Sequence, residues 1–367
     1  MKLTIFGLTV SSSWGNGHAT LWRGLIRALT RRGWQVAFFE RDQPYYAAAR
    51  DLDRIEGGKL VLYPDWSSVR SLAACEAADS DVAIVTSYCP DAIEATGLVL
   101  DAPALRVFYD LDTPVTLSRL RQGEATGYIG QGGLAGFDLV LSYTGGAALD
   151  ELRSALGAGR VAPLYGHVDP GHHRPAAPNP AFRGDLSYLG TYAADRQPGV
   201  ERFLVGPARR RPGRRFVIGG ALYPRDFPWT PNIHFVRHLP PADHPAFFAA
   251  SRLTLNVTRR AMAEMGWCPS GRLFEAAACG AAIATDVWPG LADFFEPGRE
   301  VVPLGGAEDA LAALELSDRE LAQLGRAARE RVLADHTSER RAVELEGLLA
   351  GARRPIERIH ALLAETA

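Results

Sequence analysis

The sequence predicts an α/β protein built from two Rossmann-like domains. Its 367 residues exceed what one hydrophobic core usually needs and suit two domains of common size. Short apolar runs alternate with amphipathic segments, which is typical of parallel sheets covered by helices. Residues 166–180, rich in proline and histidine, interrupt this alternation before it restarts. We therefore expect domains at residues 1–170 and 181–340, followed by a helical segment at 341–367.

Bulk composition narrows the class of function. The net charge of −2 argues against binding nucleic acid or a membrane surface by bulk attraction. Only Lys2 and Lys59 are lysines among 40 basic residues, so an isolated arginine carries little information. The four cysteines show no C-x-x-C spacing, and no run approaches the roughly twenty apolar residues that span a bilayer. We expect a cytoplasmic protein without an integral membrane segment or a nucleic-acid partner.

The first half opens as strand, loop, helix and strand. Residues 2–10 predict a buried strand, residues 11–18 a turn-rich loop, and residues 35–39 a second strand after the helix. Loops at the carboxyl ends of parallel strands bind ligands in such sheets. Gly15-Asn16-Gly17 lacks the third glycine of a dinucleotide fingerprint, so that kind of site is only weakly indicated. Further strands are expected at residues 59–63, 81–86, 105–109, 138–142 and 161–165.

The second half contains the stretch richest in chemistry, residues 267–291. Ser270 offers a hydroxyl cap to a helix that starts at Gly271, and free amides at such a start suit a phosphate. The positive charge of Arg272 in the first turn is unfavourable beside the positive end of the helix dipole, so an anionic partner close by would explain its position. Glu275, one turn further, can accept two hydroxyl hydrogen bonds from a sugar ring. An ordinary capped helix followed by a strand fits these residues equally well. Strands are also expected at 185–190, 215–218, 233–236 and 253–257, with helices after residue 302.

The run S-x-R-x-F-E-A-x-A-C-G at residues 270–280 resembles the nucleotide-sugar site of GT-B glycosyltransferases. It is most similar to the CgeB-type, spore-maturation branch of the family-4-like group. In the broader retaining group, an E-x7-E signature spans this helix start, and its second Glu, matched by Glu275, holds the ribose. The first Glu would fall at Trp267, and the nearest acid is Glu264. This departure leaves the contact to the transferred sugar, and the stereochemistry, open.

Other positions follow from the same resemblance. The S-x-x-G-x-G-H loop at residues 12–18 is similar to the opening of GT-B amino-terminal domains, which implies that Gly15, Asn16, Gly17 and His18 face the acceptor. A solvated loop histidine is the alternative for His18.

In the second half, the resemblance implies that Gly190, Tyr192 and Gly219 surround the nucleotide. Arg259, which follows a strand, is a candidate donor to a diphosphate or an ordinary surface arginine. GT-B proteins end with helices that can cross back, so residues 341–367 are candidates for returning to the first domain.

Two further groups have competing interpretations. Asp110-x-Asp112 follows a strand and forms a D-x-D pair, but the Thr113-Pro114 that follows also makes Asp112 a candidate helix cap. A cleft-lining pair is favoured over a metal site, because two Rossmann-like halves argue against the metal-using architecture. His167, His172 and His173 stand among prolines without a matching acid, so solvated linker residues are favoured over a metal cluster.

The resemblance implies a glycosyltransferase of hexosyl type. It would move a sugar from a nucleotide-diphosphate sugar, with a UDP-sugar favoured, to a glycan, lipid or small-molecule acceptor. No metal or other cofactor is expected, so Ser270, Gly271, Arg272 and Arg259 would neutralise the departing phosphate.

An inverting reaction would need a base, for which His18 and Asp112 are candidates, whereas a retaining reaction would need none. A sugar-nucleotide epimerase of the same fold and a non-catalytic nucleotide-sugar-binding module are the alternatives. The incomplete E-x7-E spacing favours the second of these. The base, the sugar, the acceptor and the oligomeric state stay open.

Overall fold

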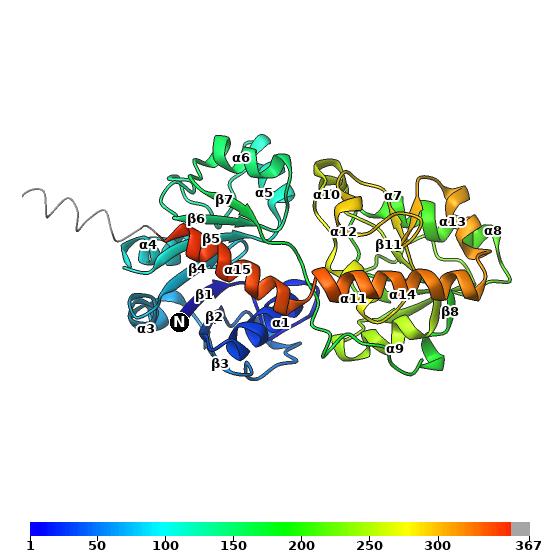
Figure 1. The fold of residues 1–367 in the computed structure, drawn as a ribbon, viewed down its shortest axis with the longest axis horizontal. Helices are drawn as coiled ribbons and strands as arrows, with labels where there is room; N and C mark the ends of the chain where they lie inside the picture. Colours follow the sequence, from blue (N-terminus) through cyan, green and yellow to red (C-terminus); the bar gives the residue numbers. More distant parts are fainter. Residues whose placement is uncertain (354–367) are drawn as a thin grey trace, which may run out of the picture.

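Two parallel sheets form the framework of the computed structural model, which describes residues 1–353 (Figure 1). The first sheet has seven strands in the order β3-β2-β1-β4-β5-β6-β7, and the second has six in the order β10-β9-β8-β11-β12-β13. In each sheet the first strand along the chain lies centrally, so the strand order reverses beside it, where such sheets bind ligands. The predicted α/β class with two Rossmann-like domains is confirmed.

The first sheet is covered by helices on both faces. Apolar side chains of α1 and α15 (Ser338–Ala352) fill one face, and those of α3, α4 and α6 fill the other. Its strands are β1 (Lys2–Gly7), β2 (Gln35–Arg41), β3 (Gly58–Tyr63), β4 (Val82–Thr86), β5 (Leu105–Asp110), β6 (Leu139–Ser142) and β7 (Val161–Pro163). Its helices are α1 (His18–Arg31), α2 (Pro44–Ala47), α3 (Trp66–Ala78), α4 (Ala92–Asp101), α5 (Thr113–Arg121) and α6 (Ala147–Leu156).

The second sheet is also covered on both faces. One core contains α8 and α13, and the other contains α9, α11 and much of α14. Its strands are β8 (Gly184–Leu189), β9 (Phe216–Gly220), β10 (Ile233–Arg237), β11 (Ser251–Asn256), β12 (Ile283–Asp286) and β13 (Val302–Leu304). Its helices are α7 (Gln197–Val200), the π-helical turn η2 (Glu201–Val205), α8 (Gly206–Arg210), α9 (His244–Ala249), α10 (Arg260–Met265), α11 (Gly271–Ala278), α12 (Leu291–Phe294), α13 (Ala307–Leu314) and α14 (Asp318–Asp335); short 3₁₀ turns are η1 (Pro180–Phe182) and η3 (Pro241–Asp243).

Strand β13 lies where the sequence predicted only helices. It pairs with β12, and Pro303 stands opposite Thr285. Proline lacks a backbone N–H, so it is tolerated in a strand at the edge of a sheet, and β13 is such a strand. A three-residue strand is also too short for an alternation pattern to reveal.

The last described helix, α15 (Ser338–Ala352), returns to the first domain (Figure 1). Leu345 and Leu349 join the core that contains Trp22 of α1. Glu346 accepts hydrogen bonds from Arg32 at 2.6 Å and from the Trp34 indole at 2.8 Å. The helix starts three residues before the expected boundary at residue 341, and the part of the expected segment beyond residue 353 lies outside the described residues.

Candidate active site

A cavity of about 510 Å³ lies between the carboxyl ends of the two sheets. This volume falls in the range of roughly 300–1,000 Å³ that is typical of small-molecule sites. Both domains contribute to its lining. The residues singled out from the sequence that line it are Gly15, Asn16, Gly17, His18 and Asp112 in the first domain, His167 in the linker, and Gly190, Arg259, Ser270, Gly271, Arg272 and Glu275 in the second domain.

Tyr192 and Gly219, which the resemblance placed around the nucleotide, are not among the residues that line the cavity. The ring of Tyr192 packs edge-on against Tyr223, with centroids 5.7 Å apart. Gly219 lies inside β9, where a Cβ atom would come within 3.1 Å of Leu189 and 3.3 Å of Phe247. This glycine serves close packing of the core.

The start of α11 forms one wall of the cavity. The Ser270 hydroxyl accepts a hydrogen bond from the backbone N–H of Arg272 at 3.3 Å and so caps the helix. Gly271 presents bare backbone: a Cβ there would have Tyr143 at 3.9 Å as its nearest neighbour. Backbone amides and the positive end of the helix dipole therefore stand beside open space, where an anion is stabilised.

Glu275 is buried behind this helix start, with 5% of its surface exposed. Arg272 donates a hydrogen bond from Nη1 to Glu275 Oε2. Burial by itself would raise the pKa of Glu275, but the charge of Arg272 and the contacts with His173 and His244 outweigh burial and lower the pKa far below its usual range. Glu275 is therefore an anion at neutral pH.

Two linker histidines are buried, which contradicts the interpretation of His167, His172 and His173 as solvated. His167 Nδ1 lies 2.9 Å from the Ser338 hydroxyl, and His173 Nε2 lies 3.4 Å from His244 Nδ1; only His172 is exposed. The linker packs against the second domain and α15, and no apolar periodicity in residues 166–180 predicts that packing. Burial lowers the pKa of His173 to about 4, so its ring is neutral at pH 7.

Arg196 is a cavity-lining residue that sequence reasoning missed. Its Nη1 donates to the Tyr188 hydroxyl at 3.2 Å and to the Thr191 carbonyl at 3.4 Å. Its Nε is buried and has no partner among the described residues. A half-buried guanidinium with an unused donor beside a cavity is suited to an anionic ligand. In the sequence it is one of 38 arginines, and no local pattern marks it as a ligand-binding residue.

The two aspartates of the D-x-D pair lie in different surroundings. Asp110 is completely buried, does not line the cavity, and has its pKa raised to about 6 by burial. Asp112 lines the cavity, accepts a hydrogen bond from the Tyr88 hydroxyl at 2.9 Å, and pairs with Arg259 Nη1 at 3.5 Å across the cleft. Its side chain does not cap α5. Burial raises the pKa of Asp112, and Arg259 opposes that rise.

Arg259 also contacts Asp195, with Nε 3.0 Å from Oδ2. It therefore lies between one carboxylate of each domain at the edge of the cavity. A diphosphate in the cavity would compete with both carboxylates for this guanidinium.

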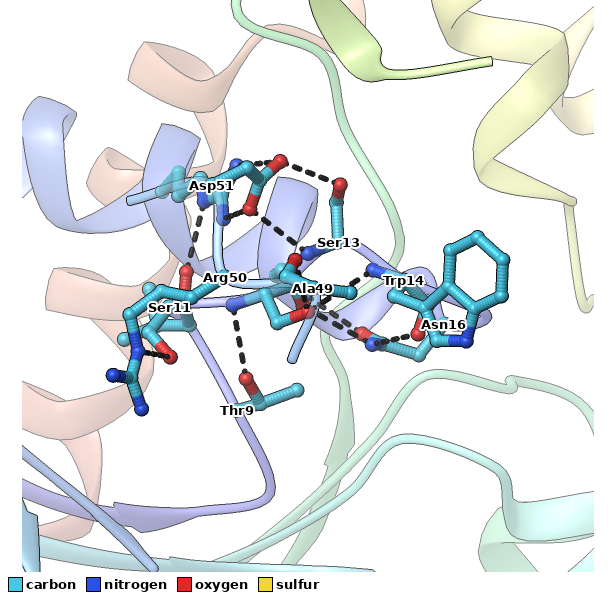
Figure 2. Close-up of polar contacts among 12 residues, drawn as sticks. Thr9, Ser11, Ser13, Trp14, Asn16, Ala49, Arg50 and Asp51 are labelled. Carbon is cyan, nitrogen blue, oxygen red and sulfur yellow. Dashed lines mark hydrogen bonds and ion pairs between the residues drawn. The ribbon is translucent and has the colours of Figure 1, made fainter. Parts of the chain in front are cut away.

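The loop before α1 holds His18 at the cavity. Figure 2 shows Ser13 facing Asp51 and Asn16 turned back toward Trp14. The Asn16 amide donates to the carbonyls of Ser12 and Trp14, so this side chain braces the loop. His18 is half-buried, and burial lowers its pKa to about 4.

Trp267 occupies the position of the first Glu of the E-x7-E signature. Its backbone carbonyl accepts a hydrogen bond from Gly145 at 3.0 Å, and its indole N–H donates to Asp293 at 2.6 Å. Glu264 is exposed beside Arg260 and does not line the cavity. The segment before α11 therefore joins the two domains and brings no carboxylate to the cavity.

Buried Glu40 anchors the loop before α1. Its carboxylate accepts hydrogen bonds from the hydroxyls of Thr9 and Ser11 and from the backbone amides of Val10 and Ser11, at 2.6–2.9 Å. The substitution Glu40→Ala leaves these donors unsatisfied, and we expect it to lower the free energy of unfolding by about 2–4 kcal/mol in urea titrations. Asp42→Ala is the control: Asp42 forms a partly exposed ion pair with Arg50, and such pairs are typically worth about 0–1 kcal/mol. Equal losses for both variants would contradict the anchoring role.

Comparisons with known proteins address the fold. A family model described as glycosyl transferase-like matches residues 196–347. Sucrose-phosphate synthase from Thermosynechococcus elongatus is similar in structure, with a TM-score of 0.71 at 16% identity over 95% of this chain and 98% of that one. None of the curated proteins matches the chain in sequence.

Two similar structures contain UDP-glucose. Anabaena HepE in complex with UDP-glucose has a TM-score of 0.65 at 12% identity, covering 96% of this chain and all of that one. An α-glucosyltransferase in complex with UDP-glucose and DNA containing an abasic site has a TM-score of 0.69 at 13% identity, covering 95% and 99%. No helix within residues 1–353 is long and apolar enough to cross a membrane. The family model and the similar structures together show that the chain has the GT-B glycosyltransferase fold.

Proposed function

We propose that the protein is a glycosyltransferase that moves a hexosyl group from a UDP-sugar to an acceptor held by the first domain. The observation that carries this proposal is the cavity between the two sheets, where the start of α11, Arg196 and Arg272 stand on one side and Asp112 on the other. Positive groups and unpaired donors lie on the second-domain side, which suits a diphosphate. The family match to residues 196–347 and the two similar structures with UDP-glucose support the same donor class.

The donor would be bound in two parts. The amides of Gly271 and Arg272 and the guanidinium of Arg196 would take the diphosphate, because each offers donors at the cavity. Glu275 accepts and cannot donate, so its carboxylate suits the ribose hydroxyls. Arg272 would turn from Glu275 toward the phosphate when the donor binds.

Transfer breaks the bond between the anomeric carbon and the β-phosphate oxygen, and the leaving diphosphate takes the electron pair. The acceptor hydroxyl oxygen forms the new bond and must lose its proton. We assign that proton to Asp112, whose raised pKa makes it a better base than an exposed aspartate. When Arg259 turns to the diphosphate, Oδ2 of Asp112 loses its ion pair and keeps only the hydrogen bond from Tyr88, so the carboxylate can accept the proton.

The finer assignments are part of this proposal. The motif at residues 270–280 supports grouping the protein with the CgeB-type glycosyltransferases. All four cysteines are free thiols, which supports a cytoplasmic location. The acceptor would be a glycan, a lipid or a small molecule.

Calorimetry with UDP-, GDP- and ADP-sugars, followed by an assay for released nucleotide, tests the function. A glycosyltransferase binds one nucleotide class and releases nucleotide slowly even without an acceptor. An epimerase would return an altered sugar nucleotide without release, and a binding module would return the ligand unchanged. Absence of binding to every nucleotide sugar would contradict the proposal.

Turnover should not depend on a divalent cation. Asp110 does not line the cavity and Asp112 is paired with Arg259, so the D-x-D pair does not present two carboxylates to one ion. We expect nucleotide release to persist in excess EDTA and to gain little from Mn²⁺. Loss of release in EDTA with recovery on adding Mn²⁺ would contradict metal-independent transfer.

A further inference from the structure

Three buried side chains from distant segments meet behind the start of α11. His173 comes from the linker, His244 from the start of α9, and Glu275 from α11. His173 Nε2 lies 3.4 Å from His244 Nδ1 and 3.9 Å from Glu275 Oε2, and His244 Nδ1 lies 3.5 Å from the same oxygen. Each residue is at most 5% exposed. The three atoms therefore form a small triangle in a nearly dry environment.

This triangle has the size of one face of a metal-coordination tetrahedron. With metal–ligand bonds of about 2.0–2.1 Å, neighbouring ligand atoms lie about 3.3–3.4 Å apart. Two of the three observed separations match that value closely, and the third is about 0.5 Å longer. Two imidazoles and one carboxylate are also a known ligand set for zinc sites that keep their fourth position open.

The orientation of His244 fits the role of a ligand. Its Nε2 lies 3.3 Å from the carbonyl oxygen of Leu239, which can only accept, so the ring proton resides on Nε2. Nδ1 then presents its lone pair to the triangle. Metal-binding histidines usually donate their other N–H to a carbonyl or carboxylate in this way.

A cationic group already contacts the triangle in this structure. Arg272 Nη1 donates to Glu275 Oε2 and lies 3.4 Å from His244 Nδ1. The Arg272 side chain is about one-third exposed and lines the cavity, so it can leave toward the cleft. A metal ion and this guanidinium would repel each other at such a distance, so they would occupy the position alternately.

We propose that His173, His244 and Glu275 form a binding site for a zinc-class transition-metal ion that competes with Arg272. The fourth position faces the cavity, because His244 and Glu275 both line it. A bound ion would take the oxygen of Glu275 and displace Arg272. The consequence, which rests on the proposed function, is that Zn²⁺ weakens UDP-sugar binding, because the ion occupies the Glu275 oxygen that would otherwise accept hydrogen bonds from the ribose.

Titration of the metal-free, full-length protein with Co²⁺ tests the site, because four-coordinate Co²⁺ has intense visible absorption. We expect saturation at one equivalent, and displacement of Co²⁺ by Zn²⁺. His173→Asn and His244→Asn should each weaken the affinity at least about tenfold, since even loss of a supporting contact costs roughly 10- to 100-fold. His172→Asn is the matched control, because this neighbouring histidine is exposed, and it should bind as the wild type does.

The substitution Arg272→Ala should change the Co²⁺ affinity in the opposite direction from the histidine variants. Removing the competing guanidinium should tighten Co²⁺ binding, a gain that misfolding cannot imitate. Absence of the absorption in both the wild type and Arg272→Ala would overturn the site, as would binding unaffected by either His173→Asn or His244→Asn.

Calorimetry with UDP-glucose, with and without Zn²⁺, separates the two proposals. Metal binding without any nucleotide binding would overturn the proposed function and leave the metal site standing. Nucleotide binding without metal binding would overturn the metal site and leave the proposed function standing. Zn²⁺ bound at one equivalent with unchanged UDP-glucose affinity would overturn the competition.

Discussion

Asp112→Asn should lower kcat by about 10²–10⁴-fold, the range that general bases contribute, without weakening UDP-sugar binding. The amide keeps the shape of the side chain and can still accept a hydrogen bond from Tyr88, but it cannot take the acceptor proton. The substitution also removes one of the two carboxylates that hold Arg259, so this arginine is freer to meet the diphosphate. The donor affinity measured by calorimetry should therefore stay equal or tighten slightly, while the steady-state kcat falls.

The pH profile gives a second measure of the same group. A carboxylate base works only when it is ionised, so kcat should fall as the pH drops through the pKa of Asp112, which burial raises above that of an exposed aspartate. The acid limb should disappear in Asp112→Asn.

His18→Gln is the comparison that locates the base. The pKa of His18 is lowered to about 4, so its ring has little tendency to take a proton at neutral pH, and we expect a smaller loss of turnover than in Asp112→Asn. If His18→Gln caused the large loss and Asp112→Asn the small one, the base would be His18.

The sequence was most informative where a structural feature leaves a local pattern. The S-x-R-x-F-E run identified the start of α11 because a capped helix start leaves a local signature: Ser270 at the cap and apolar side chains at helical spacing behind it. The two-sheet architecture was equally visible, since buried parallel strands appear as separate apolar runs.

The ends of β8 and β9 were harder to place. Gly219 was predicted to meet the nucleotide, whereas Gly220 and Ala221 line the cavity, and Thr191 does so in place of Tyr192. The cavity is lined by consecutive residues at and just after the two strand ends, so a small error in the expected strand end selects a neighbouring residue that does not line it.

Contacts between segments that are distant in the chain could not be predicted from the local sequence pattern. His173, His244 and Glu275 are far apart in the chain, and only the packing of a proline-rich linker against the second domain brings them together. Arg196 was similarly hidden among 38 arginines, because nothing in the local sequence distinguishes an arginine that lines a cavity from one on the surface.

The double substitution Arg196→Ala with Arg272→Ala should have the second large effect, on binding of the donor. Losing one charge-assisted hydrogen bond in a desolvated site costs about 1.5–3 kcal/mol. If both arginines meet the diphosphate, the two losses together weaken UDP binding by roughly 10²–10⁴-fold, with departures from additivity because they share a ligand. Uridine lacks phosphate, so its affinity should hardly change. Calorimetry with UDP and uridine measures both effects.

Glu275→Gln and Arg214→Ala complete the experiment. Glu275→Gln should weaken UDP and uridine alike, and should matter much less for a 2′,3′-dideoxy analogue, because the lost contact is to the ribose hydroxyls. Arg214, which pairs with Asp185 at the opposite end of β8, is the control arginine and should leave UDP binding unchanged. The single variants Arg196→Ala and Arg272→Ala then show whether the two losses in UDP affinity are additive or coupled. Equal UDP binding by the wild type and the double variant would mean that the start of α11 is scaffold, and the diphosphate would have to lie elsewhere in the cavity.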